Sequence, residues 1–366
     1  MNPAFRTIEI LLATCLLFVA ACLQAAQARS GDIEGAPYAV WRPAEANGIL
    51  LLRAPGYRPM DAPRGIVWEA SEDPVYAALI DDGWTVAMTR YRRNGWVIDD
   101  GVTDVAALIE NLSAAYGPFR IVIVEGESMG GLIVTRLVED PARSGLVSGA
   151  VAFGAALAVP RDRLTELGGD PADLSLNHAP TRPLYFVSNR NELAGPLAYL
   201  ARAAMEETHM SVAVHSLERP GHVNLADEER SLALLRIYNW VSGEPPARLD
   251  DASVDVPQTV GSGRLGDDAI AAEVTLVDPN YGNIDLNVTL ADLRQYGADF
   301  GDRIGIRKGE QTHFARIGDR YASVPAGQWV AVVLPDGQLR LAINMGHAAS
   351  ALGVEPGSEL LLLPAQ

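Results

Sequence analysis

Short apolar runs alternate with amphipathic stretches from about Tyr38 to Val241. The strand candidates are Gly48–Pro55, Trp84–Arg90, Arg120–Glu125, Ser148–Phe153, Pro183–Val187 and Met210–Ser216. Helical spacing of apolar residues fills most of the gaps, at Asp73–Asp82, Val102–Tyr116, Met129–Glu139, Ala194–Thr208 and Leu225–Val241. This alternation predicts an α/β fold with a doubly wound, mainly parallel sheet covered by helices on both faces. The C-terminal ends of such strands meet along one edge, where ligands bind.

The pattern changes after a connector rich in Pro, Asp and Ser at Ser242–Val260. The later β-runs are Ala271–Val277, Arg303–Arg307, His313–Ile317, Trp329–Leu334, Leu339–Ile343 and Glu359–Leu363. Turn signals such as Pro335–Gly337 separate several of them, which predicts a small all-β barrel or sandwich. We therefore expect a signal segment at 1–28, an α/β domain at 29–243, a linker at 244–265 and a β-domain at 266–366.

The first residues have the features of an export signal. Arg6 precedes an apolar stretch, Ile10–Leu23, that is short for a transmembrane helix. Ala26–Ala28 fits a small-residue cleavage site, so that the mature chain begins at Arg29. A competing interpretation is a lipoprotein signal, with lipid attached to Cys22. Either interpretation predicts an exported protein, periplasmic or secreted, with no transmembrane segment in the mature chain.

The net charge and the cysteine and histidine content exclude several classes of ligand and reaction. A formal net charge of −17 argues against binding to nucleic acid or to an anionic membrane. The two cysteines, Cys15 and Cys22, both lie in the signal segment, which excludes a disulfide and cysteine catalysis from a chain cleaved after Ala28. The six histidines show no H-x-x-x-H pairing, so we expect no zinc site and no cofactor.

Gly126, Ser128 and Gly130 form a G-x-S-x-G motif between a predicted strand and a predicted helix. A sharp strand-to-helix turn strains the serine and crowds its neighbours, so glycine is needed two residues away on each side. The turn exposes the hydroxyl, and the helix N-terminus behind it favours a developing anion. This context predicts a nucleophilic Ser128; the alternative is a glycine-rich turn that contains a serine by chance.

Two later loops carry residues that a nucleophilic serine needs. His222 lies in Arg219–Asn224, after the last strand of the α/β pattern, where it can reach back to the serine as a general base. Glu192 is the only acid in the loop after Pro183–Val187, and we expect it to orient the histidine. Asp162 is the reserve candidate for this acid, and a surface role for Glu192 is the alternative.

An ester or amide transition state places negative charge on the carbonyl oxygen, which two backbone N–H groups usually stabilise. We expect one donor at Met129, directly after the serine. The other is expected at Tyr57, in the turn that ends the first strand candidate. The alternative for Tyr57 is a plain strand-ending turn.

With these residues in the order Ser128, Glu192, His222, residues 38–242 resemble the α/β-hydrolase family, particularly secreted esterases and peptidase-like enzymes. The stretch Tyr91–Trp96 and the acidic helix start that follows it are similar to that group. Two features depart from the pattern: Pro55–Gly56 stands where the family usually has His-Gly, and the acid is glutamate rather than aspartate. The short, polar segment 154–182 implies that a large lid is absent.

The tail resembles the C-terminal domain of S-adenosylmethionine hydroxide adenosyltransferases and halogenases. The matching pieces are Val277–Asn283 with Asn287, Tyr321–Gly327, Leu341–Ala349 and Gly353–Leu361. The resemblance implies a trimer interface and a ligand-contact motif at Asp278, Tyr281 and Asn283. The family's catalytic domain is missing, so adenosylmethionine chemistry is not expected, and the motif equally suits a purely structural turn.

The sequence therefore predicts an exported serine hydrolase that cleaves a small-molecule ester, or less readily an amide, through an acyl-enzyme. The alternative is an oligomeric binding or assembly protein in which the tail recognises a nucleoside-like ligand and the hydrolase core is secondary. The identity of the ester is not encoded in any motif, because loops form the walls of such pockets.

Overall fold

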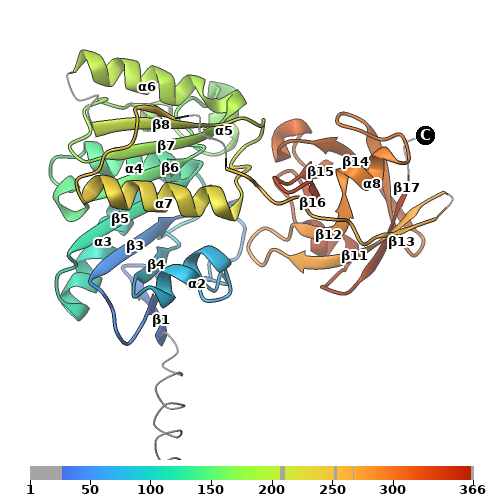
Figure 1. Cartoon of the computed structure of the whole chain (residues 1–366), viewed down its shortest axis with the longest axis horizontal. Helices are drawn as coiled ribbons and strands as arrows, with labels where there is room; N and C mark the ends of the chain where they lie inside the picture. The colour runs from blue at the N-terminus through green and yellow to red at the C-terminus, as the bar shows by residue number, and fades with distance from the viewer. Residues whose placement is uncertain (1–26, 207–210, 251–253, 267, 364–366) are drawn as a thin grey trace, which may run out of the picture.

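The computed structural model describes residues 27–206, 211–250, 254–266 and 268–363, which form an α/β domain and a β-barrel side by side (Figure 1). Cys15, Cys22 and most of the predicted signal segment lie outside the described residues. The predicted mature start, Arg29, falls inside the first strand. Within the described ranges, no helix combines the length and apolar character needed to cross a membrane.

The α/β domain is built on a nine-stranded sheet of order β1-β2-β4-β3-β5-β6-β7-β8-β9. Its strands are β1 (Gln27–Ile33), β2 (Ala36–Arg42), β3 (Ile49–Ala54), β4 (Thr85–Thr89), β5 (Ile121–Glu127), β6 (Gly149–Phe153), β7 (Leu184–Asn189), β8 (Val212–Leu217) and β9 (Leu249–Asp250). Only the β1–β2 and β2–β4 pairs are antiparallel among these strands. The predicted mainly parallel sheet is confirmed.

Helices cover both faces of this sheet, because successive strand residues point to opposite sides. Leu50 and Leu52 pack with α3 (Ile98–Tyr116), α4 (Met129–Glu139) and α6 (Ala194–Met205). Ile49 and Leu51 pack on the other face with α2 (Pro74–Asp81) and α7 (Asp227–Val241). The doubly wound fold class of the prediction is thus confirmed.

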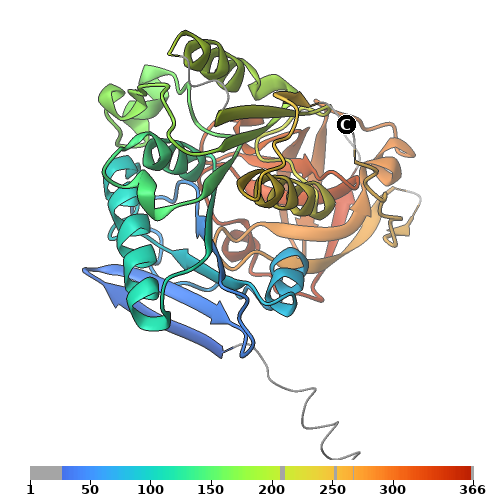
Figure 2. The ribbon, with the colours of Figure 1, turned by 60° about the vertical axis from the view of Figure 1, so that its left-hand side comes forward.

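Two elements of the sheet were missed by the sequence analysis. The β1–β2 hairpin turns at Glu34 and Gly35, both with positive φ, and forms the edge of the sheet farthest from α6 (Figure 2). Its first strand is polar and has no apolar alternation that would mark it. The two-residue strand β9 lies in the predicted linker and pairs with β8. It is too short for a periodic pattern to reveal.

The second domain is a closed barrel. Its strands are β11 (Ile270–Val277), β12 (Ile284–Thr289), β13 (Arg303–Lys308), β14 (Gln311–Gly318), β15 (Trp329–Val333), β16 (Gln338–Ile343) and β17 (Glu359–Leu363), and a short β10 (Arg264–Leu265) extends one side. Pairing of β11 with β17 closes the sheet on itself. Strand β12 was missed, because its sequence follows directly on the turn of the ligand-contact motif. Closure leaves the described barrel without the open edges that would require a partner, so a homo-oligomer remains a prediction from the family resemblance alone.

The barrel lies against the sheet edge where the parallel strands end (Figure 1). Arg58 donates a hydrogen bond to the carbonyl oxygen of Asn280 at 2.9 Å, and Arg90 donates to the side-chain oxygen of the same residue. Asn224 donates to the carbonyl oxygen of Val333 at 3.2 Å. These contacts place the barrel over the edge that carries the candidate site.

Gly130 offers a direct test of the turn that ends β5. A Cβ atom at this position would lie 1.9 Å from the carbonyl oxygen of Ala54, which is backbone and has no room to move. Gly130→Ala is expected to destabilise the fold by more than about 3 kcal/mol, measured by urea unfolding. Gly145→Ala, where nothing lies within 4 Å of the added atom, is the control. A similar urea midpoint for the two variants would show that the turn can move to accommodate a Cβ atom at position 130.

Candidate active site

Ser128 lies at a strained turn between β5 and α4. Its backbone has φ 53° and ψ −112°, a combination that costs a non-glycine residue energy and is typical of functional sites. A Cβ on Gly126 would lie 2.1 Å from the carbonyl oxygen of Gly130, so the first glycine is required by contact with the second. The Ser128 amide donates to the carbonyl oxygen of Phe153 at 2.9 Å, which anchors the turn on β6. The predicted strand–turn–helix context is present.

The structure brings Ser128, His222 and Glu192 into one hydrogen-bonded relay. His222 Nε2 lies 2.8 Å from Ser128 Oγ, and His222 Nδ1 lies 2.6 Å from Glu192 Oε1. The three side chains come from the turn after β5, the loop after β8 and the short helix after β7 (Arg190–Glu192). Glu192, and not Asp162, contacts His222 Nδ1. Asp162 is exposed in the first turn of α5 (Arg161–Glu166).

Asparagine side chains at the end of β7 hold the histidine loop. The Asn191 carboxamide accepts a hydrogen bond from the Gly221 amide at 2.7 Å. The buried Asn189 accepts from the Asn224 amide at 2.9 Å and donates to the Asn224 carbonyl oxygen at 3.0 Å. This loop has Gly221 at φ 151° and Val223 at φ 52°, so it needs external hydrogen bonds to keep its shape. Sequence reasoning missed these residues; two asparagines within three residues after a buried strand were the available signal.

The loop after β3 lies against the serine. A Cβ atom on Gly56 would be 3.6 Å from Ser128 Cβ, and Gly56 lines a small pocket together with Met129. The Tyr91 hydroxyl donates to the carbonyl oxygen of Pro55 at 2.9 Å and fixes the loop. Tyr57 is half-buried and does not line this pocket, so Gly56 is the loop residue that the structure places beside the serine. The oxyanion roles of Met129 and Tyr57 remain predictions.

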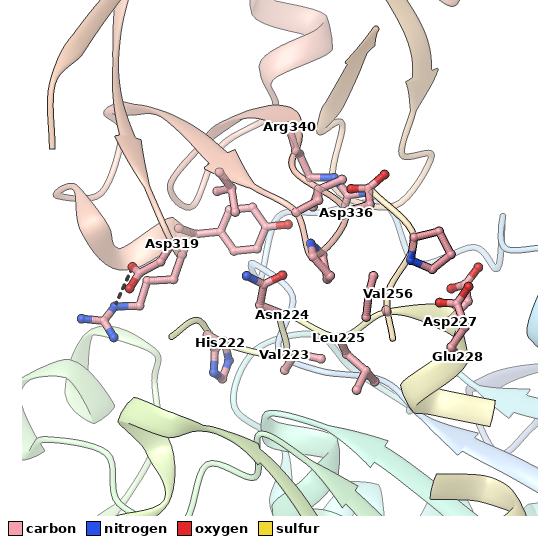
Figure 3. Close-up of a pocket in the computed structure, with 17 residues that line it drawn as sticks. His222, Val223, Asn224, Leu225, Asp227, Glu228, Val256, Asp319, Asp336 and Arg340 are labelled. Carbon is pink, nitrogen blue, oxygen red and sulfur yellow. Dashed lines mark ion pairs between the residues drawn. The ribbon is translucent and has the colours of Figure 1, made fainter. Parts of the chain in front are cut away.

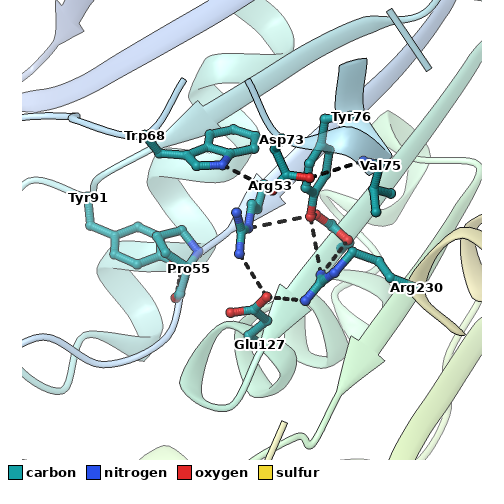
Figure 4. A network of polar contacts seen from close by, with 10 residues as sticks. Arg53, Pro55, Trp68, Asp73, Val75, Tyr76, Tyr91, Glu127 and Arg230 are labelled. Atoms are coloured by element: carbon teal, nitrogen blue, oxygen red, sulfur yellow. Dashed lines mark hydrogen bonds and ion pairs between the residues drawn. The ribbon is translucent and has the colours of Figure 1, made fainter. Parts of the chain in front are cut away.

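Glu127, the residue before Ser128, belongs to a largely buried network of charges that sequence reasoning did not find (Figure 4). Glu127, which precedes Ser128, accepts from Arg53 Nη2 at 2.8 Å and also from Arg230. Arg230 Nη1 lies 3.2 Å from Glu125 Oε2, and the Tyr76 hydroxyl donates to Glu125 as well. Burial alone works to raise the pKa of Glu127, but Arg53 and Arg230 outweigh it and lower the pKa to about 2. The network therefore holds an ionised carboxylate directly before Ser128.

The predicted ligand-contact residues of the tail lie in the β11–β12 turn. The Asp278 carboxylate accepts from the backbone amides of Asn280 and Tyr281, at 2.7 and 3.0 Å. Gly282 has φ 66°, and Asn283 donates to the Tyr321 hydroxyl at 3.1 Å. These contacts are what a structural turn requires. Nucleoside binding by Asp278, Tyr281 and Asn283 stays a prediction.

A cavity of about 390 Å³ opens between the two domains beside His222 (Figure 3). Its lower wall is the histidine loop and the start of α7, and its upper wall is the barrel. The barrel contributes Asp319, Tyr321 and Arg340, whose guanidinium group pairs with Asp285 at 2.6 Å. A cavity of this volume suits a small molecule. The barrel thus forms the wall of this cavity that faces the histidine loop.

Comparison with known proteins bears on the two domains separately. Residues 272–361 match the profile of the SAM hydroxide adenosyltransferase C-terminal domain. This match confirms the resemblance of the tail and covers most of the described barrel. No curated protein matches the chain.

Among solved structures, the chain is similar to an uncharacterized conserved protein from Thermotoga maritima, with 21% identity and a TM-score of 0.27 over 40% of this chain and 55% of that one. An esterase from Pyrococcus furiosus has 16% identity and a TM-score of 0.41, covering 59% of this chain and 90% of that one. The brefeldin A esterase, a bacterial homologue of human hormone-sensitive lipase, has 18% identity and a TM-score of 0.43, covering 60% and 76%. Likenesses this distant carry no conclusion about activity.

Glu192→Gln tests the acid of the relay. The amide keeps the shape of the side chain but cannot offset the charge that forms on His222, so we expect kcat to fall by about 10²- to 10⁴-fold. Steady-state hydrolysis of a short-chain ester is the measurement, and Asp162→Asn is the matched control. A larger loss in the control would transfer the role to Asp162.

Proposed function

We propose that the protein is a serine hydrolase that cleaves an ester through an acyl-enzyme. The observation that carries the proposal is the relay from Ser128 through His222 to Glu192, with contacts of 2.8 and 2.6 Å. A serine hydroxyl is a weak nucleophile on its own, and an adjacent base oriented by a third group is the usual means of activating it. Placement of the serine at the N-terminus of α4 adds a favourable field for a developing anion.

In the proposed mechanism Ser128 Oγ attacks the ester carbonyl carbon while His222 Nε2 removes the hydroxyl proton. Backbone N–H groups of Met129 and of the 55–57 loop stabilise the oxyanion, and Glu192 stabilises the imidazolium. The imidazolium then protonates the leaving alcohol, which departs. Water, deprotonated by His222, attacks the acyl-serine and releases the carboxylic acid.

The cavity beside His222 points to a small substrate. Because His222 protonates the leaving oxygen, the leaving alcohol lies on its side of the serine, where the 390 Å³ cavity opens. A fluorophosphonate probe tests the nucleophile, and a panel of short acyl esters tests the reaction. The proposal fails if the folded protein is neither labelled nor active on any short ester.

Export is proposed from the apolar segment before β1. Intact-mass analysis of the protein from its native host is expected to show a chain that begins near Arg29 or carries lipid on Cys22. The mass of the full Met1–Gln366 chain would contradict both. A start at Arg29 would remove the first two residues of β1, Gln27 and Ala28, which pair with Arg42 and Trp41.

The alternative function, a nucleoside-binding or trimeric assembly protein, rests on the family match at residues 272–361. A core that had become a mere scaffold would be free to lose members of its relay. The complete relay therefore favours the hydrolase.

A further inference from the structure

Two buried arginines that line the small pocket of Gly56 and Met129 have no ion-pair partner among the described residues. Arg58 follows the β3 loop and Arg90 follows β4, and each is only 5% exposed. Among the described residues, no carboxylate oxygen lies within ion-pair distance of either guanidinium group. Arg58 Nε and Nη1 and Arg90 Nε have no hydrogen-bond partner there. Burying an unpaired charge costs folding free energy, so two buried, unpaired guanidinium groups indicate a functional role.

Nearby arginines show what the usual solution is. Arg53 and Arg230 are bound by Glu125 and Glu127, and in the barrel Arg340 is bound by Asp285. Arg58 and Arg90 lie close enough to oppose each other's charge, and burial lowers the pKa of both.

Their neighbours in the barrel compensate the two charges only in part: Asp278 and Tyr281 favour the charge on Arg58 and Tyr281 that on Arg90, but burial still lowers the pKa of both. Burial raises the pKa of Tyr281, whose ring lies 6.0 Å from the Arg58 guanidinium carbon, so its phenol stays neutral. The Asp278 carboxylate instead accepts hydrogen bonds from two backbone amides of its own turn.

One residue of the barrel accepts hydrogen bonds from both arginines. Asn280 offers its carbonyl oxygen to Arg58 and its side-chain oxygen to Arg90. Two oxygens shared between two guanidinium groups is also the arrangement that a carboxylate provides. The remaining cavity, about 10 Å³, has room for one water molecule, so a larger group requires the 278–281 turn to shift.

The location indicates which part of a substrate would reach the arginines. Arg58 and Arg90 share their pocket with Gly56 and Met129, on the oxyanion side of the serine. The leaving alcohol belongs on the opposite side, beside His222. A group bound by the arginines is therefore carried by the acyl part of the ester.

Building on the proposed function, we propose that Arg58 and Arg90 bind a carboxylate at the end of a short acyl chain, taking over the hydrogen bonds that Asn280 makes. The substrate is then the half-ester of a short dicarboxylic acid. The barrel shapes this specificity, because its 278–281 turn covers the site.

Rates on two esters of equal length test the specificity. Monoethyl succinate carries the charge, and ethyl 4-methylpentanoate has an uncharged isopropyl group of similar shape in place of the carboxylate. Wild type is expected to favour the half-ester in kcat/KM by at least about 10-fold, and Arg58→Gln or Arg90→Gln to lose that preference. Arg264→Gln removes the same charge from an exposed arginine that pairs with Glu359 and does not line this pocket, and it is expected to keep the preference for the half-ester. No preference in wild type, or equal losses on both esters, would overturn the assignment.

Binding separates this inference from the proposed function. Calorimetry of monoethyl succinate on Ser128→Ala is expected to give heat that disappears when Arg90→Gln is added. Asn280→Ala keeps both arginines and removes one competing acceptor, so it is expected to bind the half-ester at least about threefold more tightly. If neither Arg90→Gln nor Asn280→Ala changes the affinity for monoethyl succinate, the arginine site is contradicted even if esters are hydrolysed. Binding without hydrolysis of either ester by wild type would instead remove the proposed function alone.

Discussion

Ser128→Ala is expected to abolish ester hydrolysis and fluorophosphonate labelling while the melting temperature stays within about 2 °C of wild type. The hydroxyl is the attacking atom in the proposed mechanism, and it contacts His222 Nε2 at 2.8 Å. Removing it leaves no nucleophile but also leaves no cavity in the core. Loss of a relay member usually costs kcat a factor of about 10⁴ to 10⁶.

The control is Ser175→Ala, an exposed serine that caps a short helix away from the relay. It is expected to retain wild-type rates and labelling. His222→Ala should lose activity to a similar degree as Ser128→Ala, and the double variant should be no worse than either, because the two side chains act as one unit. Activity of Ser128→Ala above about a thousandth of wild type would point to another nucleophile.

Arg230→Met is expected to destabilise the fold by about 3–5 kcal/mol, because it leaves the buried Glu125 and the partly buried Glu127 with less compensation. Arg230 lies 3.2 Å from Glu125, contacts Glu127 and stacks on Phe153 with its guanidinium carbon 4.6 Å from the ring centre. Methionine replaces much of the aliphatic stem, so the loss reports on charge more than on packing. Urea unfolding followed by circular dichroism is the measurement.

Arg136→Met is the matched control, since Arg136 pairs with Asp99, whose side chain is 78% exposed. An exposed pair contributes little, and the expected loss is under about 1 kcal/mol. Equal losses for the two variants would show that the buried network does not stabilise the fold.

The same network has a pH signature. The pKa of Glu127 is lowered to about 2, below its ordinary value, so its ionised form stabilises the fold above about pH 4.5. That contribution is lost as the pH falls toward 2. Burial raises the pKa of Glu125, which acts in the opposite direction. The stability difference between wild type and Glu127→Gln should therefore shrink between pH 5 and pH 3, whereas a constant difference would contradict the assignment.

Local sterics explain why the nucleophile turn was predictable from the chain. The β-branched run of β5, the glycines at 126 and 130 and the apolar spacing of α4 are all set by residues within about twenty positions of each other. His222 and Glu192 were found because their loops follow β8 and β7, and parallel strands bring such loops to one edge. The motif order along the chain was enough to name these three residues.

Contacts between distant residues decided the rest. Arg58 and Asn280 are 222 positions apart, and Arg230 and Glu125 are 105 apart. Neither contact can be read from the local pattern of apolar and polar residues. Closure of the barrel depends on β11 meeting β17, and the polar strand β1 is held only by pairing with β2. Sequence periodicity reports which face of an element is buried, but the partner of a charged group is chosen by packing in three dimensions. For this reason the chain alone was enough to predict that Ser128, His222 and Glu192 lie together, while the arginine pair and the barrel wall emerged only from the folded domains.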